Sequence, residues 1–157
     1  MMQVFLVLHD IRSSENVGSI FRTADAAGVS KIYLTGYTPA PLDTFKRTNS
    51  KLTKASLGAE EFVAWEKVED IYALFSQLRK KGVQIVAVEQ SPRSIEYTEF
   101  RLTKPAALIF GNEVEGVPET VLRESDAIVE IPMHGKKESL NVAVAAGVIL
   151  FSSGKLT

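Results

Sequence analysis

The chain has 157 residues, no cysteine, 45% hydrophobic residues and a formal net charge of −1. A chain of this length buries roughly 68–70% of the surface that its unfolded form exposes, which predicts one domain with one core. The lack of cysteine excludes a disulfide framework, a thiolate nucleophile and a Cys-ligated metal, and it fits a reducing, cytoplasmic location. The two histidines, His9 and His134, show no metal-ligand spacing, so we expect no metal.

Short aliphatic runs alternate with helical patterns along the chain. Runs of this length, bounded by turn residues, are typical of strands. Their alternation with helices predicts an α/β fold with a mostly parallel sheet, in a single domain over residues 1–157. No apolar run approaches the ~20 residues that span a bilayer, so we expect a soluble protein without a membrane partner. The predicted strands cover residues 3–8, 31–35, 62–65, 83–88, 106–110 and 128–131.

The first helical pattern covers residues 16–27. Asn16 precedes its first apolar residue, where asparagine often caps a helix, and a ligand contact is the alternative. Gly18 and Arg22 are four residues apart and share a face, on which a glycine lets another backbone or a ligand come close to the guanidinium. Arg22 suits a phosphate or carboxylate ligand, or else it pairs with Asp25 on a solvated surface.

Positive charge is concentrated near the start of the chain. Residues 1–58 contain seven Lys or Arg and four Asp or Glu, a net charge of +3, whereas residues 59–157 contain eleven and fifteen, a net charge of −4. Within residues 44–54 there are four cations and no acid, and such a patch attracts polyanions. A nucleic-acid contact and an ordinary solvated surface both fit this pattern. The four cations are Lys46, Arg47, Lys51 and Lys54.

A second helical pattern covers residues 68–81, and Pro118 with the acid after it suits the first turn of a short helix. In open α/β sheets, ligands bind outside the carboxyl ends of the strands. Gln90, Gly111 and Met133 each follow just after a predicted strand. We therefore expect the functional site at that edge of the sheet.

The run GNEVEGV follows the predicted strand 106–110. It contains neither the GxGxxG fingerprint of dinucleotide-binding folds nor a Walker loop, so a different kind of ligand loop is required. Gly111 and Gly116 bracket a turn whose backbone amides can cradle a ligand while the carboxylate of Glu113 faces it. An ordinary polar loop is the alternative.

The run HGKKESLNV leads into the last helix, over residues 140–151. Ser139 and Asn141 bracket the start of that helix, where Ser can cap it and Asn can reach the site. His134 and the two lysines after it fit a solvated loop. Because Asn141 is the helix's one polar side chain before its last turn, we expect the helix to be buried on nearly every side. Either the same chain or a second subunit in a twofold dimer covers it.

Taken together, three segments resemble the motifs of the SpoU (TrmH-like) RNA ribose 2′-O-methyltransferases. DIRSSENVGSIFRTADAAGV is similar to the first motif, LIFGNEVEGVP to the second and IPMHGKKESLNVAVAAGVIL to the third, in the right order over residues 10–150. The resemblance implies an α/β fold with helices on both faces of the sheet, a C-terminal deep trefoil knot and a homodimer. Periodicity alone predicts no knot, because knots are very rare in proteins.

The resemblance also implies a reaction, the transfer of a methyl group from S-adenosylmethionine to a ribose 2′-hydroxyl of structured RNA, with tRNA favoured over rRNA. Arg22 is implied as the central catalytic residue. A guanidinium is a poor general base, so it suits binding of the adjacent phosphate and stabilisation of the developing alkoxide. Asn16, Glu113, Ser139 and Asn141 are the other implied catalytic residues.

Two further sets of residues complete these expectations. The implied cofactor contacts are Val88, Gly111, Ile131, Met133, Ser139 and Leu140. The expected RNA contacts are Arg12, Arg22, Lys46, Arg47, Lys51 and Lys54.

We expect the chain to be close to the bare catalytic domain, without the added segments that many members of the family use to hold RNA, so the sequence leaves the target RNA open. Two functions of other classes are also compatible with the sequence. One is a non-catalytic RNA-binding or ribosome-assembly factor with the same fold, and the other is an α/β domain that binds a small molecule.

Overall fold

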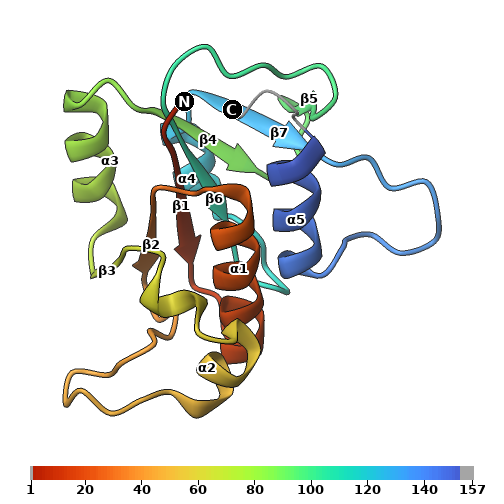
Figure 1. Ribbon diagram of the computed structural model, residues 1–157. Helices are drawn as coiled ribbons and strands as arrows, with labels where there is room; N and C mark the ends of the chain where they lie inside the picture. The colour runs from red at the N-terminus through yellow and green to blue at the C-terminus, as the bar shows by residue number, and fades with distance from the viewer. Residues whose placement is uncertain (1, 153–157) are drawn as a thin grey trace.

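The computed structural model describes residues 2–152, which form a three-layer α/β domain around one seven-stranded sheet (Figure 1). Every strand pair is parallel, and the strand order is β3-β2-β1-β6-β4-β7-β5. The strands are β1 (Val4–His9), β2 (Lys31–Thr35), β3 (Trp65–Val68), β4 (Gln84–Val88), β5 (Ile95–Glu96), β6 (Ala106–Phe110) and β7 (Ala127–Glu130). The helices are α1 (Ser14–Ala27), α2 (Ser50–Ser56), the 3-10 turn η1 (Ala59–Glu61), α3 (Ile71–Lys80), α4 (Glu119–Glu124) and α5 (Val142–Ser152).

Helices cover both faces of the sheet because side chains alternate between the two faces along each strand. Leu6 and Leu8 of β1 pack into the core under α1, α2 and α5, whereas Val7 packs into the core under α3 and α4. β1 lies inside the sheet between β2 and β6, with Leu6 opposite Ile32 of β2 and Leu108 of β6. The predicted α/β fold with a mostly parallel sheet and helices on both faces is confirmed.

The predicted strand at residues 62–65 is wrong. Phe62 ends the 3-10 turn and is 77% exposed, and the strand begins only at Trp65, which lies opposite Ile32 of β2. The two residues after Trp65 are charged and exposed, as an edge strand allows, so an apolar pattern could not locate it. Sequence analysis also missed the two-residue strand β5 and the helix α2.

Caps explain where the helices begin. Asp70 accepts hydrogen bonds from the amides of Tyr72 and Ala73, so α3 starts three residues later than the pattern from residue 68 predicted. The Asn49 side chain accepts a hydrogen bond from the amide of Leu52 and starts α2 inside the basic segment, residues 44–54. That segment was analysed for charge, so its helix was overlooked.

The last helix, α5, is apolar all round but only partly covered. Ala146 and Ile149 are buried in the core beside α1, whereas Val144 and Phe151 are 53% and 58% exposed. Burial on nearly every side is therefore wrong for a single chain, and so is the alternative that the same chain covers this helix. None of the helices within residues 2–152 has the length and hydrophobicity to span a bilayer.

Candidate active site

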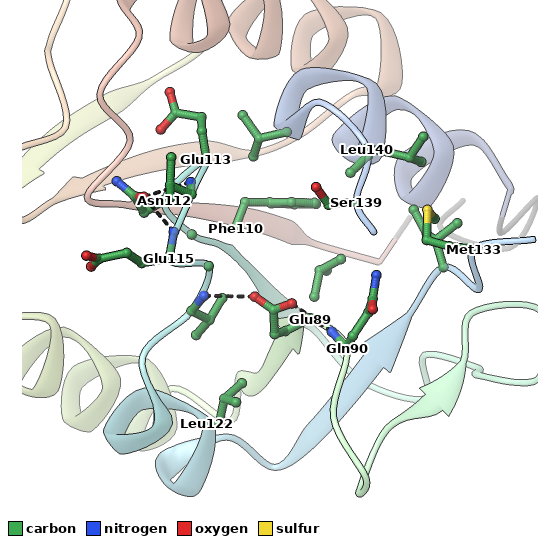
Figure 2. A pocket seen from close by; sticks show the side chains of 18 residues that line it. Glu89, Gln90, Phe110, Asn112, Glu113, Glu115, Leu122, Met133, Ser139 and Leu140 are labelled. Carbon is green, nitrogen blue, oxygen red and sulfur yellow. Dashed lines mark hydrogen bonds between the residues drawn. The ribbon is translucent and has the colours of Figure 1, made fainter. Parts of the chain in front are cut away.

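A cavity of about 390 Å³ opens at the carboxyl ends of β4, β6 and β7 and against the start of α5 (Figure 2). This is the edge of the sheet at which the site was expected. Its volume lies within the ~300–1,000 Å³ typical of small-molecule sites. All six residues expected to contact the cofactor line it, namely Val88, Gly111, Ile131, Met133, Ser139 and Leu140.

The loop after β6 folds back on itself to form one wall of the cavity. The Asn112 side chain oxygen accepts hydrogen bonds from the amides of Val114 (2.8 Å) and Glu115 (2.9 Å). The amide of Gly116 donates to the Asn112 carbonyl oxygen at 2.9 Å, and a Cβ on Gly111 would lie 2.5 Å from the carbonyl carbon of Gly116. Gly111 is needed because the two ends of the turn touch through their backbones, and Gly116 is needed because its φ is +70° and a Cβ there would overlap the Glu89 carboxylate.

Glu113 connects this loop to the start of α1. Its carboxylate accepts hydrogen bonds from the backbone amides of Arg12 (2.9 Å) and Ser13 (2.8 Å), and from the side chain amide of Asn16 (3.3 Å). Partial burial acts to raise the pKa of Glu113, but the hydrogen bonds outweigh it and hold the pKa below its ordinary value. The site therefore contains a fixed negative charge at neutral pH.

Asn16 and Asn141 extend the connection to the last helix. The side chain amide of Asn141 donates to the side chain oxygen of Asn16 at 3.1 Å. Asn141 also caps α5, because its side chain oxygen accepts from the amides of Ala143 and Val144. One hydrogen-bonded chain, Glu113–Asn16–Asn141, thus joins the three segments that sequence analysis singled out.

The capping hypotheses for this region are wrong. Ser13 caps α1 by accepting from the amide of Asn16, so the Asn16 side chain is free to contact Glu113 and Asn141. Asn141 rather than Ser139 caps α5, and Ser139 instead lines the cavity. His134 is exposed and does not line the cavity, in keeping with the solvated loop expected for it.

Glu89 and Asn112 were not expected to line the cavity, and Gln90 was expected only near the site, from its place after a predicted strand. Glu89 accepts hydrogen bonds from the amides of Val117 (2.9 Å) and Gln90 (2.8 Å), and the Gln90 side chain donates to the Glu138 carbonyl oxygen at 2.6 Å. Glu89 and Gln90 both line the cavity, as does Asn112. Their place after β4 and β6 was a usable signal, but polar residues in loops are common and the pattern alone did not separate these from the rest.

The lining is acidic. Glu89, Glu113 and Glu115 lie in the wall, and no lysine or arginine among residues 2–152 lines this cavity. Aliphatic side chains from β4 and from the segments before and within α5 complete it. Such a cavity suits a ligand that combines an apolar or aromatic part with positive charge.

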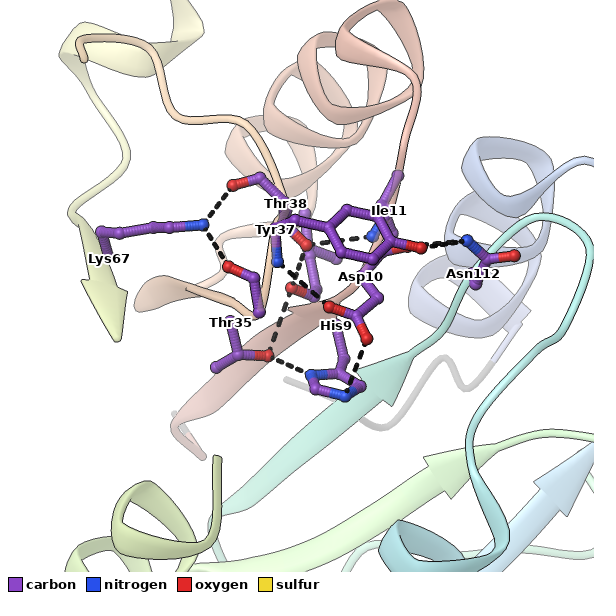
Figure 3. A network of polar contacts seen from close by, with 10 residues as sticks. His9, Asp10, Ile11, Thr35, Tyr37, Thr38, Lys67 and Asn112 are labelled. Atoms are coloured by element: carbon purple, nitrogen blue, oxygen red, sulfur yellow. Dashed lines mark hydrogen bonds and ion pairs between the residues drawn. The ribbon is translucent and has the colours of Figure 1, made fainter. Parts of the chain in front are cut away.

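A polar network supports the cavity from the ends of β1 and β2 (Figure 3). The Asn112 side chain amide donates to the Asp10 carbonyl oxygen (2.9 Å) and to the Tyr37 hydroxyl (2.8 Å). The Asp10 carboxylate accepts from the Tyr37 amide and contacts His9 Nε2 at 3.4 Å. Burial lowers the pKa of His9, against the opposing effect of Asp10. The network fixes the loop after β6 to two neighbouring strands.

Arg22 lies apart from this cavity. It is exposed and lines a separate surface hollow with residues of α1, α2 and α5. It forms no ion pair or hydrogen bond with any described residue, including Asp25. Gly18 faces α2, where a Cβ would overlap the Leu52 carbonyl oxygen, so the glycine admits another backbone. A single chain therefore does not bring Arg22 to the other expected site residues. The other residues of the hollow are Ser19, Thr23, Ala26, Ala55 and Phe151.

The expected RNA contacts are exposed. Asp43 lies just before the acid-free segment and pairs with Arg47 at 2.7 Å, which offsets one of its positive charges. Asn49, at the base of the segment, donates from its side chain to the Ser14 hydroxyl at 3.0 Å. The segment is thereby attached to the same end of α1 as the Glu113 network. The exposed cations are Arg12, Lys46, Arg47, Lys51 and Lys54.

Residues 3–151 match the model of the SpoU rRNA Methylase family. The chain therefore belongs to this family. It is 35% identical over 144 residues to the tRNA (guanosine(18)-2′-O)-methyltransferase of Aquifex aeolicus. The aligned region covers 92% of this chain and 65% of that protein. It spans 56% of the length of two further curated relatives.

Solved structures agree in fold. The AdoMet-bound rRNA methyltransferase from Sinorhizobium meliloti matches with a TM-score of 0.83 and 32% identity, covering 95% of this chain and 54% of that one. A structure solved for the 2-OH methylation of C/U34 on tRNA matches with a TM-score of 0.80 and 30% identity, covering 96% of this chain and 93% of that one.

Proposed function

We propose that this domain binds S-adenosylmethionine and methylates a ribose 2′-hydroxyl of RNA, with tRNA favoured over rRNA. The observation that carries the proposal is the hydrogen-bonded chain Glu113–Asn16–Asn141 at the rim of the cavity, because it joins all three family segments around one ligand-sized space. Membership of the SpoU family supports the same chemistry. An RNA substrate also supports a cytoplasmic place of action.

The cavity fits the cofactor. Val88, Ile131 and Leu140 provide aliphatic surface for an adenosine group, and the backbone of the loop at residues 111–117 provides polar contacts. The acidic lining suits a molecule with a sulfonium and an ammonium group. When bound, S-adenosylmethionine would supply an electrophilic methyl group, and loss of that methyl would convert its sulfonium into a thioether.

The chain's own residues divide into two roles. Asn16, Glu113 and Asn141 use most of their hydrogen-bonding groups on one another and on backbone amides, so we assign them as positioning residues. Arg22 and Ser139 are exposed and available to substrate or cofactor. The Arg22 guanidinium binds the phosphate next to the reacting ribose and stabilises the alkoxide as the proton leaves. Ser139 positions the substrate or the cofactor.

Arg22 reaches a cavity in this scheme through a homodimer. It shares its hollow with Phe151 of α5, and α5 exposes apolar side chains that a second copy of the chain would cover. When a second subunit packs on this face, Arg22 of the first subunit lies next to the methyl donor bound by the second. We also propose that the C-terminal segment forms the deep trefoil knot of the family, which the family match over residues 3–151 supports.

The basic segment is proposed to hold the RNA. Lys46, Arg47, Lys51 and Lys54 offer phosphate contacts that are sensitive to salt and largely independent of sequence. Two observations favour tRNA. One curated relative is named for methylation of tRNA at guanosine 18. One solved structure, of which the match covers 93%, is described by its 2-OH methylation of C/U34 on tRNA.

Calorimetry with S-adenosylmethionine, followed by transfer of labelled methyl to bulk tRNA and to ribosomal RNA transcripts with mapping of the modified nucleotide, tests the proposal. Binding with transfer to a ribose supports it. Binding without transfer would favour a non-catalytic RNA-binding factor, and the absence of binding would favour an unrelated small-molecule domain.

A further inference from the structure

Phe45 is a large apolar side chain that the fold leaves outside the core. It is 77% exposed and lies at the tip of the connection between β2 and α2, beside Lys46 and Arg47. Isolated exposed apolar residues are normal on protein surfaces, so exposure alone carries no function. The surroundings of Phe45 distinguish it.

The tip that carries Phe45 is held in one shape. The Asp43 carboxylate accepts hydrogen bonds from the amides of Phe45 (2.8 Å) and Arg47 (2.9 Å), and the amide of Lys46 donates to the Asp43 carbonyl oxygen at 2.9 Å. These contacts hold the pKa of Asp43 below its ordinary value, the backbone hydrogen bond from Arg47 being the largest cause. An ordered tip loses little conformational entropy on binding, which favours a contact role.

Arg47 is held next to the ring of Phe45. Its guanidinium carbon lies 5.1 Å from the ring centroid, and its Nε donates to Asp43 at 2.7 Å. The tip therefore presents an aromatic ring and a guanidinium plane together. Both groups stack on nucleic acid bases that are not already stacked in a duplex.

The tip is attached on the catalytic side of the molecule. Its connection projects from the same end of the sheet as the carboxyl end of β1 (Figure 1), and Asn49 at its base bonds Ser14 beside the Glu113 network. An RNA held at the tip therefore lies on the side of the sheet that carries the proposed methyl-transfer site.

Phe62 provides an internal comparison. It is also 77% exposed, but it follows Glu60 and Glu61, whose charges repel a polyanion. The same side chain thus occurs once in a cationic setting and once in an acidic one.

We infer that Phe45 is a base-stacking contact, and that the substrate of this domain is an RNA that presents an unpaired nucleotide to the tip. The inference rests on the proposed function and narrows its substrate class. Fully paired RNA keeps its bases stacked inside the duplex and offers the ring no partner, whereas a hairpin loop does.

The test compares full-length wild type, Phe45→Ala, Phe45→Trp and Phe62→Ala for binding to two probes. One probe is an RNA hairpin with an unpaired loop, and the other is a paired RNA duplex with the same number of phosphates. Phe45→Ala should weaken hairpin binding by about 5- to 150-fold and leave duplex binding unchanged. Phe45→Trp should bind like wild type, and Phe62→Ala should not differ from it.

Salt dependence separates stacking from phosphate contact. Because stacking releases few counterions, the slope of log affinity against log salt should be the same for Phe45→Ala and wild type. Equal hairpin affinity of the two proteins would overturn the inference, and so would an equal loss on the duplex. A change in dimer mass for Phe45→Ala in light scattering would overturn it in favour of a protein contact.

Methyl transfer to bulk tRNA by the same proteins keeps the two proposals apart. If wild type transfers methyl and Phe45→Ala has an unchanged KM for RNA, the stacking inference is refuted and the proposed methyltransferase function is retained. Absence of both cofactor binding and transfer in wild type would remove the proposed function itself.

Discussion

Asn16 and Arg22 of helix α1 have opposite environments. In the first turn of the helix, Asn16 is tied to Glu113 and Asn141, so its amide is largely satisfied within the chain. Further along, Arg22 is exposed and bonded to no described residue. A group that shapes a binding site gains from internal hydrogen bonds, whereas a cation that must meet a substrate gains from being left available. The comparison indicates that one chain completes the Glu113–Asn16–Asn141 network and leaves Arg22 open to solvent.

Loss of the available cation should have the largest effect. In Arg22→Ala, we expect methyl transfer to fall about 10²- to 10³-fold, because the developing alkoxide loses its stabilising charge. Cofactor binding by calorimetry and the thermal unfolding midpoint should match wild type. Arg22→Lys should recover only part of the rate, since an ammonium lacks the fork that grips a phosphate. The surface control Arg123→Ala should behave as wild type, and full activity of Arg22→Ala would contradict the assignment.

Mixing Arg22→Ala with Asn16→Ala shows which subunit supplies Arg22, because we expect Asn16→Ala to lose activity through the loss of its contacts with Glu113 and Asn141. In a mixed dimer, the Arg22→Ala subunit keeps an intact cavity and the Asn16→Ala subunit keeps an intact Arg22. These two parts form one complete site only if the arginine acts across the interface. We therefore expect activity to reappear on mixing. No recovery, with mixed dimers present by mass, would place Arg22 and the cavity of one chain in the same site.

Gly18 lies between Asn16 and Arg22 and allows α2 to pack close to α1. Gly18→Ala should lower the free energy of unfolding by about 1–3 kcal/mol, because its Cβ overlaps the Leu52 carbonyl oxygen and lies 2.8 Å from the Ala55 Cβ. Gly147→Ala is a matched control in α5, where the nearest atom, of Thr23, is 3.9 Å away. It should be neutral or stabilise by up to about 1 kcal/mol. Equal effects in denaturant unfolding would refute this packing argument.

The basic segment extends the cationic side, and its neutralisation should have a smaller effect. Replacing Lys46, Arg47 and Lys51 with Gln should weaken RNA binding about tenfold at low salt and flatten the salt dependence of log affinity, with cofactor binding retained. Unchanged affinity at low salt would reject the segment as an RNA contact. Gln substitutions of Lys80, Lys81 and Lys104, which are exposed elsewhere, remove equal charge and serve as the control.

The satisfied side of α1 should show the smallest effect, with a defined pH dependence. Glu113→Gln should cost about 1 kcal/mol of unfolding free energy at neutral pH, because two backbone amides lose a charged acceptor. The folded pKa of Glu113 lies below its ordinary value of 4.5, so the stabilisation is complete above that value and is lost as pH falls through the folded pKa.

Denaturant unfolding of both proteins between neutral and acid pH measures this effect. The difference in free energy between wild type and Glu113→Gln should shrink below pH 4.5, and a difference that grows there would contradict it. Glu115→Gln, from the same loop, removes a carboxylate that accepts no hydrogen bond from the described residues, and it should change stability little at neutral pH.

Sequence analysis located most of the sheet and the six residues expected to contact the cofactor, all of which line the cavity. Strands 31–35 and 106–110 agree with β2 and β6 because continuous aliphatic runs bounded by turns have few alternatives. Edge strand β3 was misplaced because its pairing with β2, rather than its own pattern, sets its position. The roles of Glu89 and Asn112 were missed because their partners lie in other segments of the chain.

The sequence by itself determined the fold class, the edge of the sheet that carries the cavity, and the segments that meet there, because periodicity, glycines and family motifs are local properties of the chain. Only the tertiary structure decided that Ser13 and Asn141 cap the two helices, that Asn16 bridges Glu113 to Asn141, and that Arg22 stays outside the cavity. These contacts depend on β1 pairing with β6 and on α5 packing against α1. Hydrogen bonds between residues about a hundred positions apart form only once that strand order is set, and no local pattern encodes it.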